Sequence, residues 1–185
     1  MALERLAVTS LTRTVVDLGR SVPLQQAVAA GDAALRAGLD PVDLAVALQQ
    51  AEGRPGIAAA RRAVGLLDAR SESAGESASR VVLHELGMPP SDLQLDVIDG
   101  GGLLVGRSDF AWRSQRTLGE FDGRTKYGRL LRPGQTAEDA LWSEKRREDA
   151  LRDLGWQVVR WVWADLRRPD LLADRLQRAF QRGAG

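Results

Sequence analysis

The chain has 185 residues, of which 44% are hydrophobic and 28% are charged, and its formal net charge is +1. This composition is typical of a soluble globular protein with one or two small domains, and the near-neutral charge argues against a uniformly basic nucleic-acid-binding protein. Cysteine is absent and His84 is the only histidine. Thiol nucleophiles, disulfides, Cys/His zinc sites and triads that need a second histidine are therefore excluded.

Targeting and membrane signals are also missing from the sequence. No apolar run approaches the roughly 20 residues that a membrane-spanning helix needs. The first residues, Met-Ala-Leu-Glu-Arg, lack the cationic start and the apolar block of a signal peptide. We therefore expect a cytoplasmic protein that makes no contact with membranes.

The first region, residues 1–70, has only helical patterns. Thr9 or Ser10 can cap a first helix, and Asp40 followed by Pro41 is a typical helix start. The remaining expected helices cover Pro23–Leu35 and Ile57–Leu67. The polar, small residues of Asp68–Gly75 are typical of a joint between domains, so we place a second domain at residues 71–185. We expect the first region to serve packing and to carry no chemistry.

The second region alternates helices with strands in the order αβββαβα, which predicts an α+β fold with a mixed sheet. The expected helices cover Ser73–Leu86, Thr136–Leu154 and Pro169–Phe180, and the expected strands include Leu93–Ile98 and Gln157–Val162. Two further strands flank the polar turn Arg113–Arg116.

Three acids lie on the hairpin that these two strands form. If the turn centres on Ser114 and Gln115, Asp109 lies directly across from Glu120, and Asp122 joins Glu120 on the same face. Two like charges at this separation destabilise an antiparallel pair, but a divalent cation between them reverses the sign. The spacing therefore favours a metal site.

A structural interpretation of the same residues stays open. In this register Arg107 faces Asp122, which would make an ordinary cross-strand ion pair. The segment from Arg107 to Arg132 is locally basic, since seven basic residues minus three acidic ones gives +4. Arginine forks suit phosphate groups, although a solvated surface would have the same composition. The arginines that we consider for contact with nucleic acid are Arg107, Arg113, Arg116, Arg124 and Arg129.

Other charged residues lie on expected helices. Glu76 is either the partner of Arg80 one turn later or a carboxylate that faces a metal. Glu144 is interpreted as surface helix charge, and His84 as a residue on a helix face.

The order of elements, an acid in the second strand, Glu-x-acid in the third and a leading helical glutamate together resemble the PD-(D/E)XK nuclease superfamily. More narrowly, several segments are similar to the actinobacterial Vsr-like endonuclease-domain proteins, which are often labelled as relatives of the AbiEi abortive-infection antitoxins. These segments are Glu76–Arg80, Gln94, Ser108–Trp112, Gly119–Tyr127, Glu144–Glu148 and Leu154–Arg160. The match covers about residues 73–180. The stretch Val8–Leu18 is also similar to the middle region of those proteins, which usually carry a winged-helix segment before it, so the resemblance implies a truncated or shorter member.

The resemblance implies a restriction-endonuclease-like core and a DNA-cutting activity. Asp109, Glu120 and the main-chain carbonyl of Phe121 would bind Mg²⁺ or Mn²⁺, and Glu76 would support the metal-bound waters. The chain departs from the superfamily motif at Asp122, where a lysine is expected, and Lys126 could supply the ammonium from the following loop. The expected activity is metal-dependent hydrolysis of DNA.

Two other functions remain open. The nuclease scaffold could be retained only as a surface for DNA in a non-catalytic, antitoxin-like regulator. The helical region could also dock a protein partner or a second copy of the chain.

Overall fold

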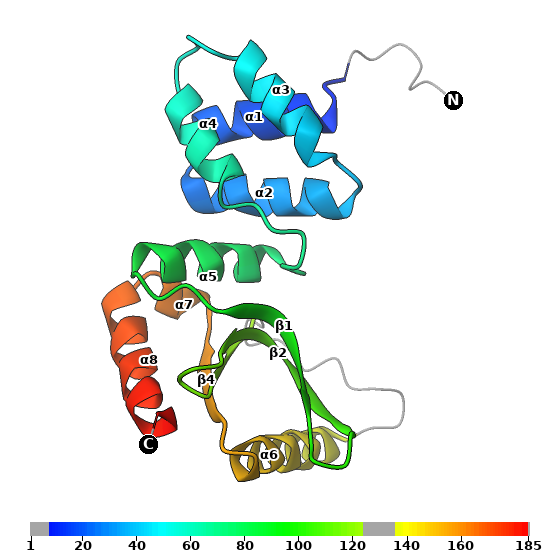
Figure 1. Ribbon diagram of the computed structural model, residues 1–185, viewed down its shortest axis with the longest axis vertical. Coiled ribbons are helices and arrows are strands. Elements are labelled where there is room, and N and C mark those ends of the chain that lie inside the picture. Colours follow the sequence, from blue (N-terminus) through cyan, green and yellow to red (C-terminus); the bar gives the residue numbers. More distant parts are fainter. Residues whose placement is uncertain (1–7, 124–135, 185) are drawn as a thin grey trace. The chain divides into compact units, whose positions relative to one another are not determined.

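The computed structural model describes residues 8–123 and 136–184 (Figure 1). It divides into two compact units, Met1–Val81 and Val82–Gly185, and the division falls within helix α5 (Ala74–Glu85). Helices come first and are followed by a four-stranded mixed sheet with helices, so the predicted α+β class is confirmed. In the described part of the chain, every helix is too short or too polar to cross a membrane.

The helices of the first unit begin where the sequence predicts them. Ser10 caps the first helix by accepting a hydrogen bond from the Arg13 N–H, and Asp40 caps the third through the Val42 N–H. The last helix ends at Val64, earlier than the predicted Leu67. The bounds are α1 Leu11–Ser21, α2 Leu24–Arg36, α3 Pro41–Gln50 and α4 Ile57–Val64.

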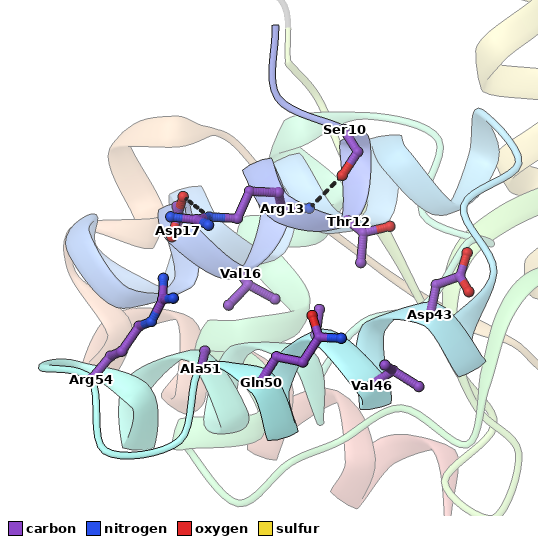
Figure 2. A pocket seen from close by; sticks show the side chains of 11 residues that line it. Ser10, Thr12, Arg13, Val16, Asp17, Asp43, Val46, Gln50, Ala51 and Arg54 are labelled. Atoms are coloured by element: carbon purple, nitrogen blue, oxygen red, sulfur yellow. Dashed lines mark hydrogen bonds and ion pairs between the residues drawn. The ribbon is translucent and has the colours of Figure 1, made fainter.

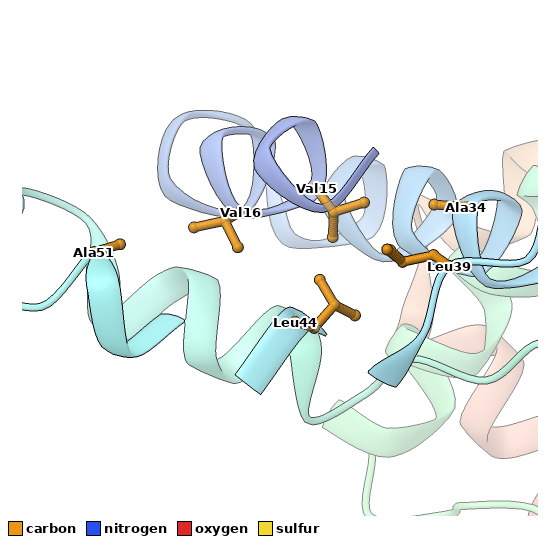
Figure 3. Close-up of a cluster of buried hydrophobic side chains, with 6 residues drawn as sticks. All are labelled: Val15, Val16, Ala34, Leu39, Leu44 and Ala51. Atoms are coloured by element: carbon orange, nitrogen blue, oxygen red, sulfur yellow. The ribbon is translucent and has the colours of Figure 1, made fainter. Parts of the chain in front are cut away.

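The core of the first unit lies between α1, α2 and α3 (Figure 3). The pattern that predicted α1 also builds this core, because Val15 and Val16 are two of the three buried residues of α1 and pack near Leu44 of α3. The cluster consists of Val15, Val16, Ala34, Leu39, Leu44 and Ala51. The helices are therefore held by a small aliphatic core.

A buried ion pair joins α2 to α5 within the first unit. Asp32 is fully buried, and its Oδ2 accepts hydrogen bonds from Arg80 Nη2 at 2.6 Å and from the Ser77 hydroxyl at 2.7 Å. Its Oδ1 accepts a third from the Asp68 N–H at 2.7 Å. A buried carboxylate is tolerated only when it is paired in this way. Asp32 therefore fixes α5 and the preceding loop against α2.

The second unit is built on one sheet of four strands in the order β1-β2-β3-β4. Strand β2 pairs antiparallel with both β1 and β3, whereas β3 and β4 pair parallel. Every predicted strand is present, and the short helix α7 was not predicted. The bounds are β1 Asp92–Ile98, β2 Leu104–Trp112, β3 Thr117–Phe121, α6 Ala137–Asp153, β4 Gln157–Trp161, α7 Trp163–Leu166 and α8 Pro169–Gly183.

The sheet has two differently covered faces, with α6 and α8 on opposite sides in Figure 1. On the α6 face, Leu151 packs against Ala111 and Leu118 in a buried apolar cluster. On the α8 face, Trp112 contacts Phe180 at 5.3 Å between ring centroids. Because strand side chains alternate, Asp109 lies on the same face as Ala111, and Glu120 on the same face as Leu118. Both acids therefore face α6.

Gly119 is required by the aromatic packing on the other face. A Cβ atom at this position would lie 2.5 Å from Trp161 Cη2 and 3.0 Å from Trp112 Cζ3. We expect Gly119→Ala to lower the free energy of unfolding by about 1–3 kcal/mol, the usual cost of overpacking a core. Urea denaturation followed by circular dichroism measures it. Gly100→Ala is the control, because no atom lies within 4 Å of its added Cβ. Equal stability of the two variants would contradict the prediction.

Candidate functional site

The register of the central hairpin is the one that the sequence predicts. Phe110 pairs with Gly119 and Trp112 with Thr117, and continuing the same register by one residue places Asp109 across from Glu120. The Arg116 N–H donates to the Arg113 carbonyl at 3.1 Å, so the turn centres on Ser114 and Gln115.

Asp109 is held in place by the neighbouring strand. Its Oδ2 accepts a hydrogen bond from the Phe121 N–H at 2.8 Å, and its side chain is half-buried. The ring of Phe121 packs edge-on against Trp163 at 5.1 Å. Asp122 follows as an exposed residue whose N–H donates to the Trp161 carbonyl at 2.8 Å. Asp109 therefore contacts the end of β3 through the Phe121 N–H, and Asp122 directly follows that strand.

Glu120 is the centre of a charged cluster that we call the Glu120 cluster, formed by Glu120, Glu144, Arg147, Glu148 and Arg160. Arg147 Nη2 lies 2.8 Å from Glu120 Oε1 and 2.9 Å from Oε2, and Arg160 Nε lies 2.8 Å from Oε2. Glu144 Oε1 accepts from both arginines, at 2.8 and 2.5 Å, and Glu148 Oε2 lies 2.9 Å from Arg160 Nη1. The Glu120 side chain is only 14% exposed.

Two elements bring this cluster together. On β4, Arg160 pairs in register with Glu120. On α6, Glu144, Arg147 and Leu151 follow one another at spacings of three and four residues, so they lie on one helix face. Leu151 lies in the apolar core. Arg147 and Glu144 precede it on the same helix face and contact Glu120 and Arg160 of the sheet.

The sequence interpretation missed the two arginines and assigned Glu144 to the surface. A signal for Arg160 existed, because a single arginine inside the apolar run Val158–Val162 has to find a carboxylate partner. Arg147 precedes the buried Leu151 by one turn, which places it at the edge of the core face.

The guanidinium groups of the cluster are firmly protonated. Burial lowers the pKa of Arg147, but its hydrogen bond to Glu144 and the charge of Glu120 outweigh this, and the net pKa is raised. Burial also lowers the pKa of Arg160, but its hydrogen bond to Glu120 and the charge of Glu120 outweigh this effect. The net pKa of Arg160 is therefore raised as well. Both residues act as fixed positive charges.

Backbone strain lies beside Asp109. Gln94 of β1 has φ 55, a left-handed conformation that residues other than glycine rarely adopt. The β1–β2 register pairs Leu93 with Phe110 and Leu95 with Ser108, which puts Gln94 across from Asp109. Strain of this kind collects at functional sites. It supports a functional interpretation of the Asp109 end of the sheet.

The arginines considered for nucleic acid are in different situations. Arg107 is exposed on β2. Arg113 pairs with Asp92 at 2.7 Å, and Arg116 donates to the Leu154 and Gly155 carbonyls at the end of α6 and stacks on Trp156 at 5.2 Å. Arg116 thus has a structural task. The predicted contacts Arg124 and Arg129, like Lys126, lie outside the described residues.

Glu76 belongs to the first unit and takes part in capping α5. Its Oε2 accepts from the Glu72 N–H and its Oε1 from the Ser73 hydroxyl, both at 2.7 Å, while the Glu76 N–H donates to Ser73 Oγ. The Ser73 hydroxyl thus accepts from the Glu76 N–H as in a capping box, whereas the Glu76 carboxylate accepts from the Glu72 N–H in place of the Ser73 N–H. His84 is exposed on α5, as the sequence indicated.

The site fits a divalent cation in its donor chemistry. Asp109 and Glu120 offer hard carboxylate oxygens from adjacent strands, which suit Mg²⁺ or Mn²⁺. Among the described residues, three acidic or histidine side chains do not gather into one metal-binding group. Both oxygens of Glu120 also accept from arginine. A cation would therefore use two carboxylates and would have to displace an arginine contact.

A pocket in the first unit is a separate feature that the sequence did not indicate (Figure 2). It has a volume of about 270 Å³ and lies between α1 and α3, with Val16 and Ala51 among its lining residues. Arg13 and Asp17 at its rim pair with each other at 2.5 Å. Two of its four charged lining residues are engaged in this way, and among the described residues no group of three acidic or histidine side chains that could hold a metal lies there.

Comparison with known proteins finds relatives without an assigned function. The chain is 36% identical over 173 residues to the uncharacterized proteins MT2308 and Rv2248 from two strains of Mycobacterium tuberculosis. The match covers 91% of this chain and 60% of each relative, so the chain spans less than two thirds of their length. It is homologous to these proteins. No protein-family model and no solved structure matches it.

Proposed function

We propose that this protein is a metal-dependent endonuclease of the PD-(D/E)XK type, related to the Vsr-like endonuclease-domain proteins, that hydrolyses phosphodiester bonds in DNA. The observation that carries the proposal is the register of β2 and β3, which, continued by one residue, sets Asp109 across from Glu120 on one face of the sheet. Adjacent carboxylates of this kind repel each other, and a divalent cation that binds both would reverse that repulsion.

The residues would divide the work as follows. Asp109 and Glu120 would hold Mg²⁺ or Mn²⁺, together with the carbonyl of Phe121. When bound, the metal would supply an acidified water and neutralise charge on the phosphate. The Phe121 N–H fixes the Asp109 carboxylate, and Arg160 fixes Glu120 from the neighbouring strand. Glu76, Asp122 and Lys126 complete the proposed catalytic set on the strength of the sequence resemblance.

The test is incubation of the purified chain with supercoiled plasmid DNA and Mn²⁺ or Mg²⁺, with and without EDTA. Nicking that requires the metal and stops with EDTA is the expected result. DNA that stays supercoiled at every metal concentration would contradict the proposal.

A second candidate is a non-catalytic DNA-binding or antitoxin-like regulator on the same scaffold. The ion pairs of Glu120 with two arginines favour it, because they satisfy both carboxylate oxygens without a metal. This function predicts salt-sensitive DNA retention that EDTA leaves unchanged and that weakens when Arg124 or Arg129 is replaced.

The helical region offers a further role in either case, as a module that binds a protein partner or a second copy of the chain. Co-purification of a partner with the full chain, or a dimer in solution, would support this role. A monomer that captures no partner would count against it.

A further inference from the structure

We propose that Arg147 occupies the cation position of Glu120 and that a divalent metal ion binds there by displacing the Arg147 guanidinium toward Glu144. The proposal rests on the metal site of the proposed function. It adds that this residue of α6 sets the affinity for the metal.

The contact geometry separates Arg147 from Arg160. A single nitrogen of Arg147, Nη2, lies 2.8 and 2.9 Å from the two oxygens of Glu120. A cation that a carboxylate binds through both oxygens takes the same central position. Arg160 approaches only Oε2, through Nε at 2.8 Å. Arg147 is therefore the direct competitor of a metal ion, whereas Arg160 can keep its contact.

The displaced guanidinium has a partner already in reach. The same Nη2 atom lies 2.8 Å from Glu144 Oε1, one turn earlier on α6, and Nη1 lies 3.5 Å from the Arg107 carbonyl. Gly106 of β2 leaves room for the chain, because a Cβ there would lie 3.3 Å from Arg147 Cδ. Arg147 can therefore leave Glu120 without becoming an unpaired buried charge, which would be costly.

The charges of the Glu120 cluster favour exchange of one cation for another. Its two arginines and three glutamates sum to −1. Arg152, which pairs with Glu148, and Asp109 on the adjacent strand have opposite charges, so the sum stays −1 when both are included. A free phosphate would meet this excess of negative charge, whereas a divalent cation balances it. Because an arginine side chain is always charged in proteins, Arg147 leaves Glu120 as a cation.

The experiment measures Mn²⁺ binding to the full chain without DNA, by isothermal titration calorimetry or by the electron paramagnetic resonance signal of free Mn²⁺. Arg147→Met removes the charge and keeps most of the length. We expect it to bind Mn²⁺ roughly tenfold more tightly than the natural sequence, within the usual range of coupling between two linked equilibria. Arg146→Met, an exposed neighbour on the same helix, should bind like the natural sequence. Adding Glu120→Gln to Arg147→Met should abolish the gain and so locate the ion.

Arg147→Lys is a second, more conservative variant that keeps the test valid if Arg147→Met does not fold. It keeps a charge but has no planar fork, and its affinity should fall between those of the natural chain and Arg147→Met. Unchanged or weaker Mn²⁺ binding by folded Arg147→Met and Arg147→Lys would overturn the inference. Tighter binding without DNA cutting would uphold it while the nuclease proposal fails. If the natural chain cuts DNA but the variants bind Mn²⁺ with unchanged affinity, the nuclease proposal stands and the inference about Arg147 fails.

Discussion

Asp109→Asn is expected to reduce metal-dependent nicking of DNA by at least about 100-fold, since a metal centre contributes several kcal/mol to stabilising the transition state. The substitution removes the negative charge that would hold the cation. It keeps a side-chain oxygen that can accept the Phe121 N–H, which lies 2.8 Å from Oδ2 in the natural protein. We therefore expect the thermal unfolding midpoint to remain close to that of the natural sequence.

Initial rates of plasmid nicking at saturating Mn²⁺ measure this effect. Asp96→Asn is the matched control, because Asp96 is an exposed acid of the same sheet, on β1, and loses the same charge. The control should nick at nearly the natural rate. An Asp109→Asn variant that is folded and retains more than about a tenth of the activity would remove Asp109 from the catalytic set.

Asp32→Ala is expected to destabilise the helical unit by about 3–5 kcal/mol, the cost of leaving one partner of a buried ion pair without the other. The Asp32 side chain is fully buried and that of Arg80 is 13% exposed, so water cannot replace the lost carboxylate at low cost. The Ser77 hydroxyl and the Asp68 N–H lose an acceptor in the same step.

Urea denaturation monitored by circular dichroism measures this loss. Glu52→Ala provides the comparison, because Glu52 pairs with Arg61 at 2.8 Å but its side chain is 68% exposed, and such surface pairs contribute about 0–1 kcal/mol. If the two variants unfold at the same urea concentration, the buried pair does not hold α5 against α2 as described.

Local patterns predicted most of this fold. Asp40, and either Thr9 or Ser10, were identifiable as caps because a side-chain acceptor before an apolar helical pattern satisfies free N–H groups within a few residues. The hairpin register was predictable for the same reason, since the turn at Ser114 and Gln115 and the alternation of side chains fix it. Helix α7 was missed because four residues are too few to show a period.

The contents of the site were predictable only in part. Asp109 and Glu120 share a hairpin, so their encounter depends on a short turn. Arg147 lies on α6 and Arg160 on β4, and both contact Glu120 on β3. Their spacing in the sequence does not indicate these contacts. The same is true of Asp32 and Arg80, which are 48 residues apart. Contacts that form through tertiary packing can be predicted only when the positions of whole helices and strands are known.

The tryptophans that pack against Gly119 also contribute to the intrinsic fluorescence of the protein. All five tryptophans lie between Trp112 and Trp163, and Tyr127 is the only tyrosine, so the helical unit contains neither chromophore. Intrinsic fluorescence therefore reports on the sheet-containing unit alone, whereas circular dichroism samples helices of both units. Comparing the two signals during unfolding separates the stabilities of the units without any label, and coincident transitions would mean that they unfold cooperatively.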